Sequence, residues 1–151
     1  LPNAMNNLLT DDSDEALVIA STTYNMIVEG ILAETVYHAY FTMLKRNGIM
    51  EGMQNGITLL KRDESRHIAY GVYLLAKSIK NDPSLFEKIE ERMNSLFLIA
   101  MGIISEIFES YDEMPFGLKM EDFTDFALDQ FNKRFEKLER AKSGIIDMTE
   151  D

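Results

Sequence analysis

Cysteine is absent from this chain of 151 residues, and histidine occurs only twice. Without cysteine, the protein has no disulfide, no cysteine-ligated iron–sulfur cluster, no thiolate zinc site and no cysteine nucleophile. Any metal ion must therefore be bound mainly by oxygen and imidazole ligands. The lack of cysteine also fits a reducing compartment, so we expect a cytoplasmic protein.

Positive charge and long apolar runs are scarce as well. The chain has 15 Lys and Arg residues against 26 Asp and Glu residues, which gives a formal net charge of −11. A surface of this charge repels nucleic-acid backbones and anionic membranes, so nucleic acid is not an expected partner. No apolar run approaches the roughly 18 to 20 residues that a membrane span requires, and the N-terminus lacks the pattern of a secretion signal. We therefore expect no membrane span.

Proline is rare, and patterns typical of strands are weak. Prolines occur only at positions 2, 83 and 115, and no stretch sustains the alternation of polar and apolar residues that is typical of a strand. The sequence therefore predicts an all-α fold, with residues 1–151 as one helical domain or part of one. Four helices are the simplest division: Ser13 to about Arg46, about Met50 to Lys80, Asp82-Pro83 to the connection at 113–117, and about Met120 to Ala141.

Local signals set the ends of these helices. Ser13 is a good N-cap, Gly48 follows the first helix as a stop signal, and Pro83 is expected at the first helical position of the third helix. Residues 142–151 are predicted to form a frayed tail. Apolar residues at helical spacing predict two stripes that face the core: Leu96, Ile99, Ala100, Ile103, Ile104 and Ile107 in the third helix, and Phe123, Phe126, Ala127, Phe131, Phe135 and Leu138 in the fourth.

The second predicted helix places a carboxylate and an imidazole in an apolar row. Glu64 and His67 share one face with the apolar and small residues Ile57, Leu60, Ile68, Gly71, Leu74 and Leu75. Both side chains are therefore expected to point into the core, where a charged group is costly unless a partner compensates it. A Glu-x-x-His pair of this kind supplies ligands in di-iron carboxylate bundles. The alternative interpretation is a surface ion pair.

The first predicted helix offers two further carboxylates. Glu29 and Glu34 both lie among apolar residues, and the helical pattern does not choose between them as a ligand. Gly30, in the middle of the helix, costs about 1 kcal/mol relative to alanine, which is more natural at a close approach of two helices or at a local distortion. His38 is expected to be a partly buried histidine, and we assign it no role.

These segments resemble a known family. TYNMIVEGILAETVYHAY followed by KRDESRHIAYG resembles the C-terminal half of the ligand-binding oxidases that are related to the small subunit of ribonucleotide reductase. The segments LPNAM and SDEALVIASTTYN are also similar, so the resemblance extends at least from Leu1 to Gly71. In this family, the number of residues between the single ligand glutamate and the glutamate of Glu-x-x-His fits the separation of Glu29 and Glu64 better than that of Glu34 and Glu64.

The resemblance implies a ferritin-like helical bundle that holds manganese and iron, or two iron ions, activates molecular oxygen and binds a long-chain fatty acid in an apolar tunnel. Glu29, Glu64 and His67 match the metal ligands of the C-terminal half. Tyr24 matches the tyrosine that becomes joined by an ether bond to a valine. Asp63 matches the acidic residue before the ligand glutamate, which can hydrogen-bond a ligand histidine.

Only half of the family's ligand set is present, because the sequence contains no second Glu-x-x-His. We expect either that the missing N-terminal half of a longer protein completes the site or that a second identical chain does so in a homodimer. Two other functions compete with the oxidase. One is a radical-generating ribonucleotide reductase small subunit, and the other is a non-catalytic metal- or lipid-binding helical module.

Overall fold

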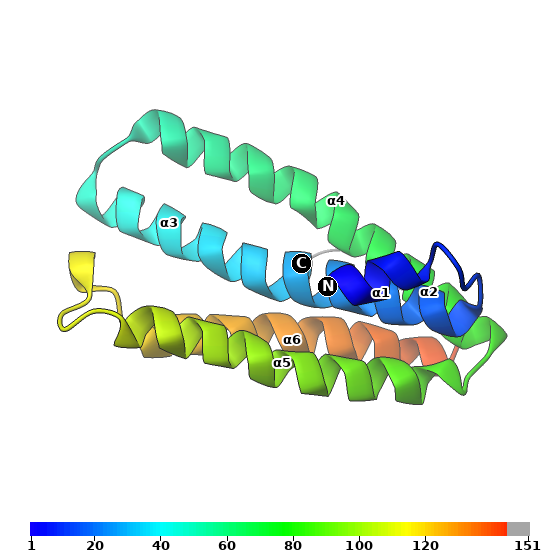
Figure 1. The fold of residues 1–151 in the computed structure, drawn as a ribbon. Coiled ribbons are helices and arrows are strands. Elements are labelled where there is room, and N and C mark those ends of the chain that lie inside the picture. The colour runs from blue at the N-terminus through cyan, green and yellow to red at the C-terminus, as the bar shows by residue number, and fades with distance from the viewer. Residues whose placement is uncertain (145–151) are drawn as a thin grey trace.

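The computed structural model describes residues 1–144, which are helical apart from short connections (Figure 1). The described residues contain no strand, so the predicted all-α fold is confirmed. Most of the predicted tail lies outside the described residues. The elements are α1 (Pro2–Asn7), α2 (Asp14–Ser21), η1 (Thr22–Ala33), α3 (Glu34–Asn47), α4 (Glu51–Asn81), α5 (Leu85–Glu109), η2 (Pro115–Gly117) and α6 (Met120–Lys142).

The elements α2, η1 and α3 follow one another without a break and form the central helix of the bundle. Its start is fixed by Ser13, whose hydroxyl accepts a hydrogen bond from the backbone N–H of Ala16 at 3.1 Å. Its end is fixed by Gly48, which adopts the left-handed conformation with φ of 62°. Both ends agree with the prediction to within one residue.

By length and composition this helix could also cross a membrane, although the sequence analysis expected no membrane span. Its most apolar part is, however, 67% buried inside the structure. In Figure 1, α4 lies on one side of it and α5 and α6 on the other. The helix contacts all three of these elements through η1. Burial of this kind is what the core helix of a soluble bundle shows.

The middle of the central helix, η1, is π-helical rather than α-helical. The backbone N–H of Glu34 bonds to the carbonyl of Glu29, five residues earlier, which is the π-helical pattern. Gly30 lies in this stretch, and a Cβ added there would lie 2.6 Å from Arg134 Nε on α6 and 2.9 Å from the carbonyl oxygen of Asn25. The glycine therefore marks both a local distortion and a close helix approach, as its position in mid-helix suggested.

The core lies where η1 meets the three long helices, and its fully buried side chains include Met26, Ile31, Leu75, Ile89 and Leu138. The predicted stripe on α6 packs into this core, with four members buried and two half-buried. The stripe on α5 is only partly confirmed. Ala100 and Ile104 are buried, but Ile99, Ile103 and Ile107 are exposed, because no described helix of this chain covers that side of α5.

Two details of the helix division differ from the prediction. Helix α5 begins at Leu85, so Pro83 is not its first residue. Instead, Asp82 closes a turn by accepting hydrogen bonds from the N–H and the hydroxyl of Ser84 at 3.0 and 2.7 Å. The short helix α1 was not predicted, although it begins with a proline at its first position, where the missing N–H costs nothing.

Candidate metal centre

Glu29 from η1 meets Glu64 and His67 from α4. One ligand atom of each residue can be chosen so that all three lie within 4.8 Å of one another. His67 Nδ1 is 3.2 Å from Glu29 Oε1 and 3.4 Å from Glu64 Oε2. The structure therefore brings together three residues that the sequence singled out, and Glu29 rather than Glu34 is the glutamate that lies beside the Glu-x-x-His pair.

The three side chains differ in burial. The side chain of Glu29 is 6% exposed and that of Glu64 is 19% exposed, whereas that of His67 is 58% exposed. The expectation that both residues of the Glu-x-x-His pair point into the core is therefore wrong for His67. Apart from its contact with Glu29 of η1, the histidine side chain is left largely uncovered by the described elements of this chain.

Glu29 is held by residues of its own helix. Asn25 Nδ2 donates a hydrogen bond to Glu29 Oε2 at 2.9 Å, which leaves Oε1 beside His67. A hydrogen bond between Tyr24 and Glu29, together with the negative charge of that carboxylate, raises the pKa of the Tyr24 hydroxyl above its ordinary value. Tyr24 and Glu29 are five residues apart, a separation that the π-helical ladder places one above the other and an α-helix does not.

The two carboxylate oxygens of Glu64 differ in their hydrogen bonding. The hydroxyl of Tyr37 donates a hydrogen bond to Oε1 at 3.2 Å. Burial, and then the charge of Glu64, raises the pKa of Tyr37, so this phenol stays a donor at neutral pH. Oε2 is buried, and none of the residues that the structure describes donates a hydrogen bond to it. A buried carboxylate oxygen without a donor is the atom that a cation would satisfy, so the residues present fit a metal ion with oxygen and nitrogen ligands.

The other acidic candidates lie apart from this cluster. Glu34 is buried, and its Oε2 is 3.8 Å from Nζ of Lys61 on α4. Asp63 is exposed, and its Oδ1 accepts a hydrogen bond from Arg66 Nη1 at 2.9 Å. Among the described residues Asp63 forms no hydrogen bond with His67. Its role as a partner of a ligand histidine stays a prediction.

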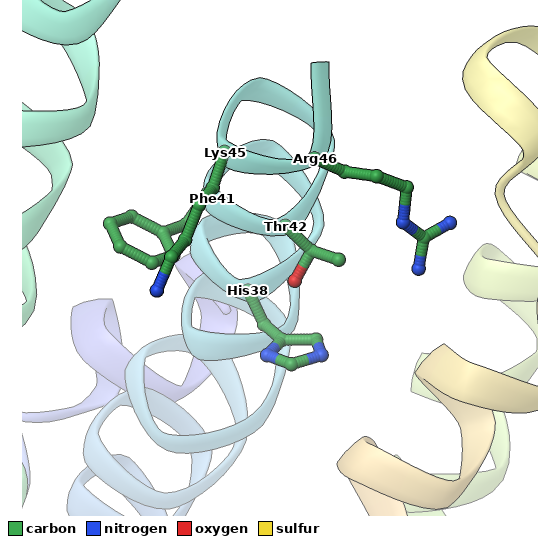
Figure 2. A pocket seen from close by; sticks show the side chains of 5 residues that line it. All are labelled: His38, Phe41, Thr42, Lys45 and Arg46. Atoms are coloured by element: carbon green, nitrogen blue, oxygen red, sulfur yellow. The ribbon is translucent and has the colours of Figure 1, made fainter. Parts of the chain in front are cut away.

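His38 lies in a separate hollow of about 480 Å³ on α3, which is lined by His38, Phe41, Thr42, Lys45 and Arg46. Figure 2 shows Lys45 and Arg46 pointing to opposite sides, with Thr42 and His38 between them. The ring of His38 stacks on Phe126 with a centroid distance of 4.1 Å. Burial, and then the nearby Lys61, lowers the pKa of His38. The hollow has no carboxylate in its lining, so His38 still has no assigned role.

A smaller, apolar pocket of about 110 Å³ lies where α3, α5 and α6 meet. Leu32 and Val36 from the central helix and Ile103 and Ile107 from α5 line it. Three of these side chains, those of Val36, Ile103 and Ile107, are exposed large hydrophobic groups. The pocket is therefore bounded in part by the uncovered side of the bundle.

Sequence reasoning overlooked two residues of the site. Asn25 lies four residues before Glu29, a spacing that indicates contact on a helix, but in this segment only Tyr24, Glu29 and Glu34 were considered as site residues. Tyr37 is the second such residue, and no local signal pairs it with Glu64, which is 27 residues away on another helix.

Comparison with known proteins identifies the family. Residues 3–143 match the family described as ribonucleotide reductase, small chain. Solved structures of variants of an R2-like ligand-binding oxidase with a reconstituted Mn/Fe cofactor are similar as well. A valine-to-leucine variant reconstituted anaerobically and a tyrosine-to-phenylalanine variant reconstituted aerobically are each 33% identical, with a TM-score of 0.83. A glycine-to-leucine variant is 33% identical, with a TM-score of 0.84.

Each of these three similarities covers 99% of this chain and 50% of the other. The chain thus spans about half the length of the oxidase chains that it matches. The resemblance inferred from the sequence is confirmed, and so is the ferritin-like helical fold. This chain belongs to the ribonucleotide reductase small chain family, and its fold corresponds to about half of an R2-like ligand-binding oxidase.

Proposed function

We propose that this chain supplies half of the ligands of an oxygen-activating dinuclear metal oxidase, with Glu29, Glu64 and His67 as its metal ligands. The proposal rests on one observation: the ligand atoms of these residues lie within 4.8 Å of one another in a chain that is 33% identical to oxidases with an Mn/Fe cofactor. Carboxylate and imidazole ligands suit manganese and iron. The proposed cofactor is therefore manganese and iron, or two iron ions.

Two residues of this chain orient the ligand carboxylates by hydrogen bonds. Asn25 fixes one oxygen of Glu29, and Tyr37 fixes one oxygen of Glu64, so each carboxylate keeps its second oxygen toward His67. The bound metals would supply the activation of molecular oxygen. Tyr24, beside Glu29, is the candidate for an ether cross-link to a valine outside this chain. Forming that ether removes the phenol hydrogen and one hydrogen of the valine, a two-electron oxidation for which oxygen is the oxidant.

The remaining ligands must come from outside this chain. His67 is more than half exposed, and the apolar Ile103 and Ile107 are uncovered. An N-terminal half in a longer protein would supply the rest of the site. Alternatively, a second identical chain would contribute the same Glu and Glu-x-x-His in a symmetric homodimer. In either form we propose a cytoplasmic protein.

The fatty acid-like ligand would bind in the apolar pocket between α3 and α5. The pocket has about 110 Å³, whereas small-molecule sites typically have about 300 to 1,000 Å³. We infer that this chain forms one wall of the tunnel and that the covering half forms the other.

The family match itself favours a second candidate function, a radical-generating ribonucleotide reductase small subunit. A non-catalytic metal- or lipid-binding module is the third.

Native mass spectrometry after anaerobic addition of manganese and iron tests the metal site and the assembly together. We expect the wild-type chain to retain metal and Glu64→Ala to lose it. Glu51→Ala, which removes an exposed carboxylate of the same helix, is the matched control and should retain metal. A dimer with two metals would support the symmetric site. If Glu64→Ala is destabilised and the stability of neither protein depends on metal, the cluster is a hydrogen-bonded network and the proposal fails.

Formation of the Tyr24 cross-link distinguishes an oxidase from a radical-generating ribonucleotide reductase small subunit. In the complete protein, exposure to oxygen should produce a cross-linked peptide that contains Tyr24, detectable by mass spectrometry after proteolysis. A complete, metal-loaded protein that never forms this peptide would favour the ribonucleotide reductase subunit.

A further inference from the structure

Asn25, which lies in η1 with Glu29, hydrogen-bonds to ligand residues both in η1 and on α4. It lies one turn before Glu29 in η1 and is 9% exposed. Its Nδ2 donates to Glu29 Oε2 at 2.9 Å and lies 3.4 Å from the backbone carbonyl oxygen of His67 on α4. Its Oδ1 accepts a hydrogen bond from the hydroxyl of Ser21 at 2.9 Å. One buried amide therefore links a ligand side chain to the backbone of a second ligand.

The orientation of this amide is determined by its neighbours. Glu29 Oε2 and the His67 carbonyl can only accept hydrogen bonds, so the NH₂ group must face them. The Ser21 hydroxyl then donates to the amide oxygen on the other side. Rotating the amide by half a turn would place two oxygens against each other at hydrogen-bond distance, without a proton between them. Asn25 is thus a fixed donor to Glu29.

The opposing helix leaves room for Asn25 at Gly71. This residue lies one turn after His67 on α4. A Cβ added to Gly71 would lie 2.3 Å from the Cβ of Asn25 and 2.8 Å from its Cγ. Real Cβ atoms do not approach so closely, so α4 can reach Asn25 only because position 71 is glycine. The glycine and the asparagine together set the separation of the two helices beside the cluster.

We propose that Asn25 is a positioning residue of the metal centre, in which it holds Oε2 of Glu29 so that Oε1 faces His67. This inference rests on the proposed metal site and adds a residue that determines how tightly the site binds. Outer partners that hydrogen-bond a ligating carboxylate typically change metal affinity by roughly 10- to 100-fold when they are removed. We expect an effect of that size for Asn25→Ala.

A purely structural role predicts a different result, and Thr23 provides the matched control. Thr23 is also buried in η1, donates to the carbonyl of Ile19 at 2.6 Å and accepts from Arg92 Nε at 3.1 Å. It makes no hydrogen bond with Glu29, Glu64 or His67. Thr23→Ala therefore removes comparable buried hydrogen bonds from the same stretch without touching the ligands.

The test is an anaerobic titration of the 151-residue chain with Mn(II), followed by electron paramagnetic resonance of free and bound ion. We expect the Kd to rise by roughly 10- to 100-fold in Asn25→Ala and the line shape of the bound ion to change. Thr23→Ala should keep the wild-type Kd and line shape. Circular dichroism checks that both variants are folded. Should Asn25→Ala not fold, Ser21→Ala takes its place, because it removes the donor that orients the amide, and we expect it to weaken binding.

The outcomes separate this inference from the function on which it rests. Tight binding by the wild-type chain with an unchanged Kd in both Asn25→Ala and Ser21→Ala overturns the role of Asn25 alone. An equal loss in Asn25→Ala and Thr23→Ala also overturns it, because the effect is then one of folding. If the wild-type protein binds no Mn(II), both as this chain alone and together with the half that supplies the remaining ligands, the proposed metal site is overturned and the role of Asn25 is overturned with it.

Discussion

Gly71→Ala probes the closest helix contact beside the candidate site. The substitution adds one carbon to α4 at a point where that carbon would lie 2.3 Å from Asn25 Cβ and 3.0 Å from Met26 Cε. The first of these atoms is attached directly to the backbone of η1, so it cannot move aside by a rotation about a side-chain bond. The helices themselves must separate.

Two opposing effects set the magnitude. Alanine is favoured over glycine inside a helix by about 1 kcal/mol. Overpacking a close contact costs about 1 to 3 kcal/mol. Gly56→Ala is the matched control, because Gly56 lies in the same helix and an added Cβ there meets nothing within 4 Å. We expect Gly56→Ala to stabilise the protein and Gly71→Ala to be less stable than this control by about 2 kcal/mol, or roughly 4 to 8 °C in Tm.

The two free energies of unfolding are measured by urea denaturation followed by circular dichroism, with Tm values from thermal scans as a second readout. Gly71→Ala should also weaken Mn(II) binding, because the added carbon displaces Asn25. Equal stabilisation by Gly71→Ala and Gly56→Ala would refute the reasoning, since it would mean that α4 and η1 do not approach each other as closely as the structure shows.

Three further predictions concern other parts of the bundle. Ser13→Ala should lower the free energy of unfolding by about 1 kcal/mol, because it removes the N-cap of the central helix, and an unchanged urea midpoint would contradict this. The hydroxyl of Tyr24 should titrate above its ordinary pKa of 10.0 in the absorbance difference between wild type and Tyr24→Phe. Glu29→Gln should bring it back toward that value, and a Tyr24 pKa at or below 10.0 would count against the contact. The pKa of His38, measured by NMR, should lie below 6.5, because burial disfavours the charged imidazolium. The unfolded chain therefore binds this proton more tightly than the folded chain does. The contribution of His38 to the free energy of unfolding should then fall as the pH drops below 6.5. A pKa of 6.5 or higher would contradict that assignment.

The long helices were predictable because their ends depend on local chemistry. The hydroxyl of Ser13 and the left-handed Gly48 act within one turn of the chain, so the first helix was located to within a residue. Pro83 was misplaced because Asp82 forms a turn with Ser84 that competes with helix initiation. The π-helical stretch of η1 has no signal of its own in the sequence beyond Gly30. It accompanies packing against α6, which is a property of the whole bundle.

The site was predictable only in part. Helical spacing correctly placed Glu64 and His67 on one face, but spacing does not show whether that face is covered, so the burial of His67 was predicted wrongly. The choice of Glu29 over Glu34 came from the family spacing. In the structure Glu29 lies beside Glu64 and His67, whereas Glu34 lies beside Lys61. The contact from Tyr37 to Glu64 links distant parts of the chain and could not be read from local patterns.

The central claim is that Glu29, Glu64 and His67 bind metal. Crystals of the chain grown anaerobically with manganese and iron, and measured at the absorption edges of both metals, test it most directly. The account predicts an anomalous difference peak bounded by Oε1 of Glu29, Oε2 of Glu64 and Nδ1 of His67, and no such peak in crystals of Glu64→Ala. The claim would be contradicted if wild-type crystals, both of this chain alone and of this chain with the half that completes the site, showed no peak among these three side chains or metal bound only at other carboxylates.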